Sequence, residues 1–526
     1  MTELRFEIRV RDRAPILGQR ELRPGAIRIA LELPPGPLEQ VRAELRLPMD
    51  EDERFFVNGY QSWTHCREQG RAGSTPGIGP LPELAVRALG LRSYGDYDFV
   101  DYPRRPGIMH GESWCYLRKG ERYRLLASLD ERPGYTLFRY DAAQGRMEIL
   151  RDCAGVEPGG LFHAFDLFYA EGTEREVFDA WMAAMQIRPR TLEPICGYTS
   201  WYNRYENISQ ETIGRDLAGA AALLQPGDLF QIDDGWERAV GDWLEADPKK
   251  FPDGMKAQAD KIHAAGLRAG LWLAPFAARR GSRIAREHPD WLLRRNGRPW
   301  LAGIGWGGFY ALDFDLPPVR EYLEQVFRRV LDEWGYDLVK LDFLYAAAPW
   351  GDSRESRAGR MARALELLRQ LCGDKPILGC GVPLMPAFGL VDYCRIGPDA
   401  GLDWDGKGLM RQTVRERVST RHTIDDTIFR RQLDGRVWRN DPDVFFLRED
   451  NIHLEPERKW ALAIVAGLFG GALLHSDDMA SWTEEARALY RQLRRLRGAE
   501  QIRVLTEHGL AVRYVLDGQE QELRIG

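Results

Sequence analysis

Two patterns of hydrophobic and polar positions divide the chain near residue 190. Before it, short runs alternate apolar and polar side chains, and clusters of Pro and Gly separate the runs. Alternation with a period of two is typical of strands that bury one face. The only long amphipathic helical pattern here is 174–185. This part therefore predicts an N-terminal β-sandwich domain over residues 1–190.

Beyond residue 190 the pattern becomes apolar strand, loop and amphipathic helix, repeated. Strands alternating with helices predict a parallel sheet, and eight such repeats predict a (β/α)8 TIM barrel, here over residues 191–498. Alternation returns in 499–526, which predicts a short C-terminal β segment. The expected strands are 195–202, 229–236, 267–275, 336–345, 376–382, 392–399, 437–446 and 471–478. The expected helices include 210–224, 255–265, 317–334, 355–372, 411–433, 456–469 and 483–497.

Two single carboxylates end different strands of this barrel. Asp342 follows the apolar run 338–341, and Asp399 follows a strand that Gly397 and Pro398 terminate. Barrel active sites lie at the C-terminal ends of the strands, and two opposed carboxylates are what a double-displacement glycosidase needs. Lys340 points the same way as Asp342, so we expect it to keep that carboxylate ionised. The structural alternatives are a buried Lys340–Asp342 ion pair and an Asp399 that only fills a turn.

Other strand ends carry groups suited to a sugar. Asp233 and Asp234 are adjacent, and two carboxylates can accept hydrogen bonds from neighbouring hydroxyls. A metal site is the alternative, but no His or further Asp stands at ligand spacing, so we expect no metal. Trp201, Tyr202 and Trp272 lie near strand ends, where aromatic faces pack against sugar rings or simply against the core.

Composition narrows the choice of partners and location. The net charge is −6, from 73 basic and 79 acidic residues, so we expect no nucleic acid and no membrane partner. No apolar run is long enough to span a bilayer, and the first residues lack the apolar stretch of a signal peptide. Seven scattered cysteines favour reduced thiols and a cytoplasmic location.

Several motifs together resemble one enzyme family, the α-galactosidases of glycoside hydrolase family 36 (melibiases), in their compact bacterial branch. The motifs occur in order along nearly the whole chain and are Asn58-Gly-Tyr-Gln-Ser-Trp63, Ser200-Trp-Tyr202, Gln231-Ile-Asp-Asp234, Gly270-Leu-Trp-Leu-Ala-Pro-Phe276, Lys340-Leu-Asp-Phe343, Ile377-Leu-Gly-Cys-Gly381, Cys394-Arg-Ile-Gly-Pro-Asp399, Asn440-Asp-Pro-Asp443 and Ser476-Asp-Asp478.

The resemblance implies a retaining exo-α-galactosidase without cofactor or metal. Asp342 would be the nucleophile and Asp399 the acid/base, and Asp233 and Asp234 would bind galactose hydroxyls. The remaining residues of the sugar shell would be Lys340, Trp201, Tyr202, Trp272, Cys380 and Arg395, with Trp63 reaching across from the N-terminal domain. The implied partners are α-galactoside oligosaccharides such as melibiose or raffinose. The N-terminal domain could pack between copies in a homo-oligomer, but no surface pattern decides this.

Four other functions stay open from the sequence. The same scaffold could act as an α-N-acetylgalactosaminidase or as a galactosyl-transferring enzyme. A non-catalytic sugar-binding barrel is disfavoured because both candidate acids are present. A metal-dependent hydrolase is disfavoured by the scattered histidines. The fold alone does not separate these functions, so the choice rests on the strand-end residues.

Overall fold

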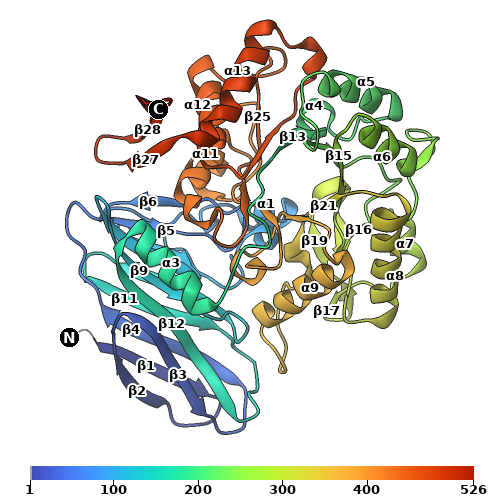
Figure 1. Ribbon diagram of the computed structural model, residues 1–526. Helices are drawn as coiled ribbons and strands as arrows, with labels where there is room; N and C mark the ends of the chain where they lie inside the picture. The colour runs from blue at the N-terminus through green and yellow to red at the C-terminus, as the bar shows by residue number, and fades with distance from the viewer. Residues whose placement is uncertain (1–2) are drawn as a thin grey trace.

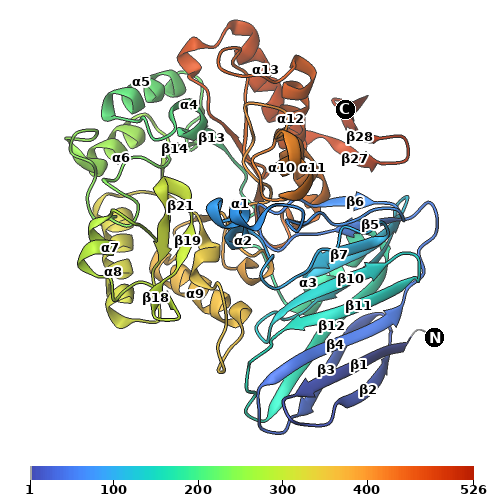
Figure 2. The ribbon, with the colours of Figure 1, turned by 180° about the vertical axis from the view of Figure 1, so that it is seen from behind.

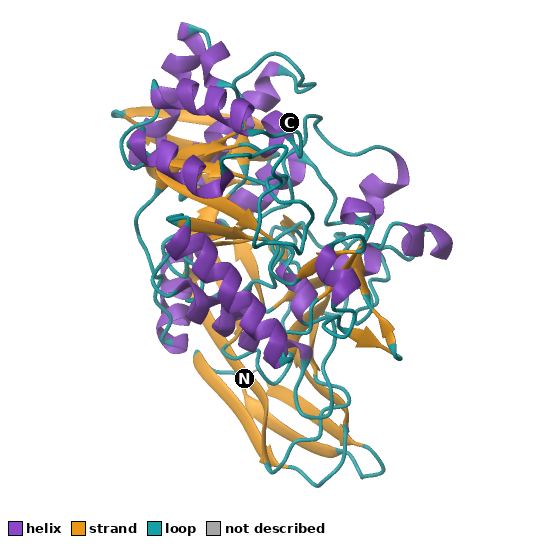
Figure 3. Ribbon diagram, turned by 90° about the vertical axis from the view of Figure 1, so that its right-hand side faces the viewer, coloured by secondary structure: helices purple, strands orange, loops and turns teal. Residues whose placement is uncertain are grey.

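The computed structural model describes residues 3–526 and combines a mostly antiparallel N-terminal part, a barrel and a small C-terminal sheet (Figure 1). The multidomain fold class predicted from the sequence is confirmed. The exact unit boundaries at residues 190 and 498 stay predictions. Figure 3 shows how the N-terminal strands extend away from the helices that surround the barrel.

The N-terminal part consists of two six-stranded antiparallel sheets, with the orders β2-β1-β4-β11-β10-β7 and β3-β12-β9-β8-β5-β6. Alternate side chains of these strands face a shared core, as in β4, whose Val41, Ala43 and Leu45 are buried. The strands are β1 (Glu3–Val10), β2 (Ile16–Glu21), β3 (Gly25–Glu32), β4 (Leu38–Arg46), β5 (Arg54–Val57), β6 (Arg67–Gln69), β7 (Ile108–Glu112), β8 (Trp114–Lys119), β9 (Arg122–Ser128), β10 (Tyr135–Asp141), β11 (Arg146–Asp152) and β12 (Leu161–Thr173). Helix α3 (Glu174–Met185) follows with a Thr173 capping box, at the residues predicted.

All eight predicted barrel strands are present, and their pairings are parallel. The predicted strand 437–446 is split into two short strands, of which β24 pairs with β23 and β25 pairs with β26. Pro442, which has no N–H to donate, lies at the break, and the ring closes through this bent segment. The strands are β13 (Ile195–Thr199), β14 (Leu229–Ile232), β15 (Arg268–Leu273), β21 (Leu338–Leu341), β22 (Ile377–Gly379), β23 (Tyr393–Arg395), β24 (Arg439–Asp441), β25 (Val444–Phe445) and β26 (Ala472–His475).

The helices around the barrel largely follow the sequence pattern. Ser209 caps α5 as predicted, because its side chain accepts from the Thr212 amide. The single helix expected over 411–433 is wrong: the chain forms α10 (Gly408–Thr413) and α11 (Thr420–Phe429), and Ser419 starts the second by capping the His422 amide. The others are α5 (Gln210–Ala221), α6 (Gly254–Ala264), α8 (Pro317–Phe327), α9 (Arg357–Cys372), α12 (Pro456–Phe469) and α13 (Glu484–Arg495).

A long insertion between β15 and β21 was not predicted. It contains α7 (Arg283–Glu287), a three-stranded antiparallel sheet and a separate hairpin, all of them short elements. The small sheet consists of β16 (Ala277–Arg279), β19 (Leu301–Gly303) and β20 (Phe309–Ala311), and the hairpin consists of β17 (Arg294–Arg295) and β18 (Arg298–Pro299). Strands of two or three residues show too little alternation to be detected in a sequence.

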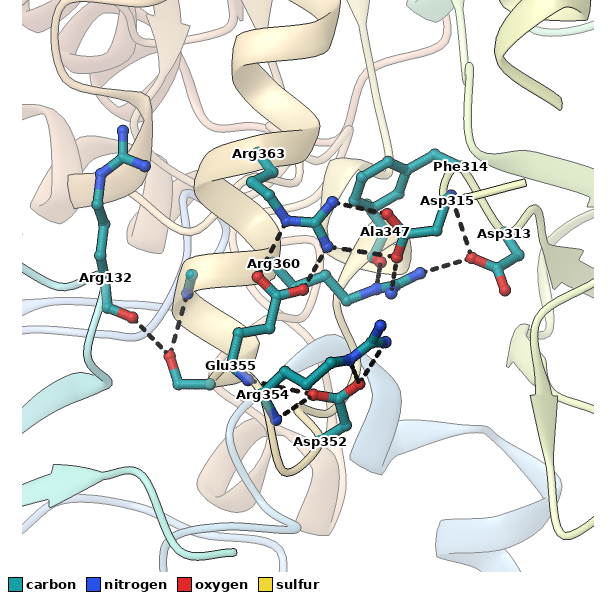
Figure 4. A network of polar contacts seen from close by, with 12 residues as sticks. Arg132, Asp313, Phe314, Asp315, Ala347, Asp352, Arg354, Glu355, Arg360 and Arg363 are labelled. Carbon is teal, nitrogen blue, oxygen red and sulfur yellow. Dashed lines mark hydrogen bonds and ion pairs between the residues drawn. The ribbon is translucent and has the colours of Figure 1, made fainter. Parts of the chain in front are cut away.

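A network of ion pairs ties this insertion to α9 and to the loop after β21 (Figure 4). Arg360 bonds Asp313 at 2.8 Å, Asp315, and the carbonyl of Ala347 at 3.0 Å. Arg363 bonds Asp315 at 2.6 Å and also binds Glu355. The loop that follows Asp342 is therefore held from two sides.

The N-terminal part reaches into the barrel through residues 58–66. The Arg430 guanidinium of the barrel is fully buried, and it donates to the carbonyls of Ser62 (3.0 Å), Thr64 (2.8 Å) and Ile396 (2.7 Å). It also donates to the side-chain oxygen of Asn58 at 3.1 Å. This buried charge fixes the loop that carries Trp63.

Two short helices of the N-terminal part, α1 (Glu83–Ala88) and α2 (Leu91–Tyr94), lie beside the barrel near β19 (Figure 2). The C-terminal residues form an antiparallel sheet of β27 (Glu500–Leu505), β28 (Leu510–Leu516) and β29 (Gln519–Ile525). Across residues 3–526 we find no helix with the length and apolar character that a bilayer crossing needs.

Candidate active site

Asp342 lies directly after β21 and is held at both carboxylate oxygens. The indole N–H of Trp272 donates to Oδ2 at 3.1 Å, and the amide of Phe343 donates to Oδ1 at 2.8 Å. Its own amide donates to the carbonyl of Leu273 on the neighbouring strand at 2.9 Å. The residue is 8% exposed. The carboxylate is therefore fixed in direction and almost dry.

Phe343 explains how the strand ends here. Its φ of 54° is in the left-handed region, which is uncommon for a residue with a side chain. This conformation turns the chain out of β21 into the 3-10 turn Leu344–Ala347 and brings the Phe343 amide back to the Asp342 carboxylate. Backbone strain of this kind is common where a site must be held in one geometry.

Asp399 follows β23 and is the more exposed of the two acids, with 36% of its side chain accessible. Arg395 donates to its Oδ1 at 2.9 Å. Arg395 itself is buried and also binds Asp441 at 3.1 Å and Asp443 at 2.7 Å, both from the segment that closes the barrel. Three carboxylates thus surround one guanidinium, which fixes the position of Arg395. Asp399 has a single hydrogen bond to Arg395.

Asp443 links this cluster to Tyr202. The Tyr202 hydroxyl donates to Asp443 Oδ2 at 2.6 Å, and the Ala400 amide donates to the same oxygen at 2.7 Å. Burial raises the pKa of Asp443 to about 7, with a further rise from Asp399 and an opposing effect of Arg395. The Asn440–Asp443 segment, one of the motifs noted in the sequence, thus supports the residue that holds Asp399.

Asp233 and Asp234 end β14 but point to different partners. Asp233 Oδ2 accepts from Lys340 at 2.9 Å, from Gln231 at 2.8 Å and from Thr199 at 3.1 Å. Asp234 Oδ2 accepts from the indole N–H of Trp306 at 2.7 Å. Asp233 is therefore a buried, fully bonded anion.

Asp234 differs from Asp233 in its protonation. Burial and the neighbouring carboxyl group of Glu237 raise the pKa of Asp234 well above that of a free aspartate. Two buried carboxyl groups in contact favour a shared proton. Asp234 can therefore donate as well as accept a hydrogen bond.

The expectation that Lys340 would keep the pKa of Asp342 low is wrong. The Lys340 ammonium bonds Asp233 rather than Asp342. Burial raises the pKa of Asp342, and the attraction of Lys340 and the bonds from Cys380 and Trp272 only partly offset this. Asp399 raises the pKa of Asp342 further, so the two candidate acids interact electrostatically.

Trp63 approaches the acids from the N-terminal part, as the resemblance implied. Its indole N–H points at the sulfur of Cys380, 3.3 Å away, and its ring meets that of Phe343 edge-on at 5.2 Å. Gly381 follows Cys380 with a φ of 55°, and a Cβ there would come within 2.8 Å of the Trp63 ring. A glycine is thus required where the two parts of the chain meet.

The structure brings most of the expected site residues together. Bonds and ring contacts join these residues in two sets. One contains Asp342, Trp272, Lys340, Asp233 and Asp234, with Trp63 and Cys380 reached through Phe343. The other contains Arg395, Asp399 and Tyr202, reached through Asp443. Trp201, in the short helix α4 (Trp201–Arg204), instead meets Tyr205 edge-on at 5.3 Å. Within the described residues, no group of three or more His, Cys, Asp or Glu side chains is arranged to hold a metal ion.

The chain resembles known proteins in both sequence and fold. The family model described as Melibiase matches residues 188–364. An α-galactosidase of Escherichia coli is 29% identical over 182 residues, which is 32% of this chain and 25% of that protein. AgaA of Geobacillus stearothermophilus is 31% identical over 150 residues, 27% of this chain and 20% of that protein. These alignments span a quarter or less of the curated relatives.

The comparison of folds covers far more of the chain. The structure of TtGalA, an α-galactosidase from Thermus thermophilus in complex with p-nitrophenyl α-D-galactopyranoside, has a TM-score of 0.73 and 30% identity. The match covers 94% of this chain and 98% of that one. The chain belongs to the α-galactosidases of glycoside hydrolase family 36. AgaA, at 14% identity and a TM-score of 0.62, shows the shared fold.

This family 36 member has site residues that the sequence analysis missed. Trp306 lies in the insertion with a φ of 55° and bonds Asp234, and Tyr94 of α2 packs against Trp63 and Tyr345. Glu237 adjoins Asp234. The glycines around Trp306 were a usable signal, since Gly305, Gly307 and Gly308 mark a turn that displays an aromatic ring. Tyr94 gave no signal, because its contacts are all distant in the sequence.

Proposed function

We propose that this protein is a retaining exo-α-galactosidase that removes terminal α-linked galactose from oligosaccharides. The proposal rests on one observation: Asp342 and Asp399 follow two barrel strands, one fixed and nearly dry, the other exposed and held by a single arginine. Family membership supports the sugar. TtGalA has been solved in complex with p-nitrophenyl α-D-galactopyranoside and with stachyose, both of which are α-galactosides.

In the first step, the Asp342 carboxylate attacks the anomeric carbon while Asp399 protonates the departing oxygen. A nucleophile gains from a fixed direction, and the Trp272 and Phe343 N–H groups hold both Asp342 oxygens. Burial removes water that would otherwise shield its charge. The acid/base must exchange a proton with the substrate and with water, and the partial exposure of Asp399 permits this.

In the second step, Asp399 removes a proton from water, and this water cleaves the galactosyl–Asp342 ester. Two inversions at the anomeric carbon return the α configuration. The mechanism requires the two carboxyl groups to be about 5–5.5 Å apart.

The remaining residues bind the sugar in this proposal. Asp233 and Asp234 receive galactose hydroxyls, with Lys340 balancing the charge of Asp233. Trp272, Trp63, Cys380, Tyr202, Arg395 and Trp201 shape the pocket. No cofactor or metal takes part. We keep the cytoplasmic location as a prediction, and the seven cysteines, all free and buried, are in keeping with a reducing compartment.

A proton-NMR time course on melibiose, raffinose and p-nitrophenyl α-galactoside tests sugar, linkage and stereochemistry together. We expect the α anomer of galactose to appear first and the β anomer only as mutarotation proceeds. Early β-galactose would contradict the double displacement. Faster hydrolysis of p-nitrophenyl α-N-acetylgalactosaminide than of the galactoside would show that N-acetylgalactosamine is the preferred sugar. Galactosyl transfer products would favour a transferase. Loss of activity in EDTA would favour a metal-dependent hydrolase.

A further inference from the structure

A large cavity lies away from the candidate active site, between the N-terminal sheet and two helices of the barrel part. Its volume is about 540 Å³, within the range of small-molecule pockets. It is lined by β5, β6 and the loop after β6 on one side and by residues 405–422 on the other. Figure 2 shows β5 and β6 beside α10 and α11. We call it the arginine cavity because seven arginines line it.

Two carboxylates also line the arginine cavity, and both already have partners. Glu68 accepts from Arg118 at 2.7 and 2.5 Å and from the hydroxyl of Tyr116. Asp405 accepts from Arg417 at 2.8 and 3.0 Å and pairs with Arg411 at 3.2 Å. Neither carboxylate is free to balance the other arginines.

Four of the seven arginines have no carboxylate partner. Among residues 3–526, the side chains of Arg54, Arg67, Arg104 and Arg421 make no ion pair and no hydrogen bond. The Nε of Arg67 is buried without a partner. A buried donor without a partner destabilises the folded protein, and more so when it is charged. Grouping such arginines around one cavity adds repulsion between like charges.

Two stacked histidines at the cavity wall report the resulting positive field. His65 and His422 lie face to face with ring centroids 3.6 Å apart. Burial lowers the pKa of His65 far below its usual range, and Arg67, Arg415, Arg417 and Arg421 lower it further. Burial, His65 and Arg417 lower the pKa of His422, and Asp425 and Asp405 oppose this. The cavity thus disfavours any additional positive charge.

This imbalance is not a general property of the surface. A second cavity of about 430 Å³ is lined by three arginines and three carboxylates, among them Arg283 and Asp242. A third, of about 450 Å³, adjoins the arginine cavity and shares Arg54, Arg67, Arg411 and Arg421 with it; its carboxylates are Glu68 and Asp425, which are bonded to Arg118 and His65. The excess positive charge is therefore concentrated in one place, at the contact of the N-terminal part with the barrel.

We propose that the arginine cavity binds a small phosphate-bearing anion. Guanidinium groups match phosphate oxygens with paired donors, and a dianion would supply the missing partner to several arginines at once. A pocket of this size takes a free phosphate or a sugar phosphate, whereas nucleic acid is disfavoured by the chain's net charge of −6. The site is independent of the proposed α-galactosidase activity.

Isothermal titration of the full-length protein with inorganic phosphate, pyrophosphate and a hexose phosphate tests this directly. We expect one-to-one binding of at least one of them, weakening as salt is added because exposed charges are screened. Tight binding of phosphate alone identifies the free ion as the ligand, and preference for the hexose phosphate identifies the ester. No binding of any of the three at low salt overturns the proposal.

Two cavity variants and a matched control locate the site. Arg54→Gln and Arg421→Gln should each weaken binding about tenfold or more, since each removes a charged donor worth about 1.4 kcal/mol or more. Arg215→Gln, on an exposed position of α5, should bind as the wild type does. Equal affinities for all three variants place the anion elsewhere and overturn the assignment. Galactoside hydrolysis by the variants, measured alongside, should stay unchanged.

Discussion

The barrel mouth and the arginine cavity treat buried charge in opposite ways. At the mouth each buried cation meets carboxylates, as Lys340 meets Asp233 and Arg395 meets Asp399, Asp441 and Asp443. In the cavity, Arg54, Arg67, Arg104 and Arg421 meet none within the described chain. These four arginines are half-buried, so water carries part of their charge, whereas Lys340 and Arg395 are buried and need their carboxylates. The mouth thus balances its charges within the chain, whereas the cavity leaves positive charge that an anion can balance.

The largest expected effect comes from the fixed acid of the mouth. Asp342→Gly should lower kcat by about 10⁴-fold or more, because no other group can form the covalent intermediate. Azide or formate should restore cleavage of p-nitrophenyl α-galactoside by attacking the β face in place of Asp342, and chromatography should identify the β-galactosyl adduct. If Asp399→Gly gives the β adduct instead, the roles of the two acids are reversed.

Asp399→Asn should reduce activity less, by about 10²–10⁴-fold. The loss should be small for p-nitrophenyl α-galactoside, whose leaving group needs little protonation, and large for melibiose. Steady-state kinetics on both substrates measure this, and equal losses on both would contradict the acid/base role.

Breaking the pairing at the mouth should also destabilise the protein. Asp441→Asn removes one carboxylate from buried Arg395 and should lower the free energy of unfolding by about 2 kcal/mol or more, followed by urea denaturation. Asp403→Asn is the control, because its pair with His453 is exposed and worth little. Equal losses for the two variants would mean that the buried cluster adds no stability.

The pH dependence of activity tests how far Lys340 offsets the effect of burial on the pKa of Asp342. Lys340 opposes the rise in the pKa of Asp342, so Lys340→Met should raise this pKa further. Because Asp342 must be ionised to attack, the acidic limb of kcat/KM should move to higher pH. Lys340→Arg keeps the charge and should leave the limb in place. A shift to lower pH would show that the ammonium does not act on Asp342.

The smallest effect is expected in the arginine cavity. Arg67→Gln removes an unpaired charge and should leave the free energy of unfolding unchanged within about 0.5 kcal/mol, or raise it. Arg118→Gln is the comparison, because Arg118 lies nearby but is buried against Glu68. This substitution should clearly lower the free energy of unfolding. A loss with Arg67→Gln as large as that with Arg118→Gln would remove the contrast between mouth and cavity.

The sequence predicted the barrel well because its signals are local. Apolar strands, capping residues such as Ser209 and helix-starting prolines at α8 and α12 all lie within a few residues of the element they define. The single helix expected over 411–433 is wrong because the chain leaves helix after Thr413 and Ser419 caps a new one. The insertion with β16–β20 was missed because its strands are too short to show a period.

The site was predictable only as far as its residues end strands. Asp233, Asp234, Asp342 and Asp399 stand at such ends and were found from their position. The partner of each carboxylate depends on distant parts of the chain. Lys340 bonds Asp233, and Trp306 of the insertion bonds Asp234. Spacing within one strand cannot specify contacts that cross the barrel, and the pKa of Asp342 followed from those contacts and from burial.

The anchoring of Arg430 has a consequence for how this protein can be rearranged. Its guanidinium sits at zero exposure with donors directed to Asn58, Ser62 and Thr64. Excising the N-terminal sheets would leave a bare cation inside the remaining protein and strip Trp63 from the sugar pocket at the same time. An exchange of domains in this protein therefore has to move the 58–66 loop together with Arg430, or replace both.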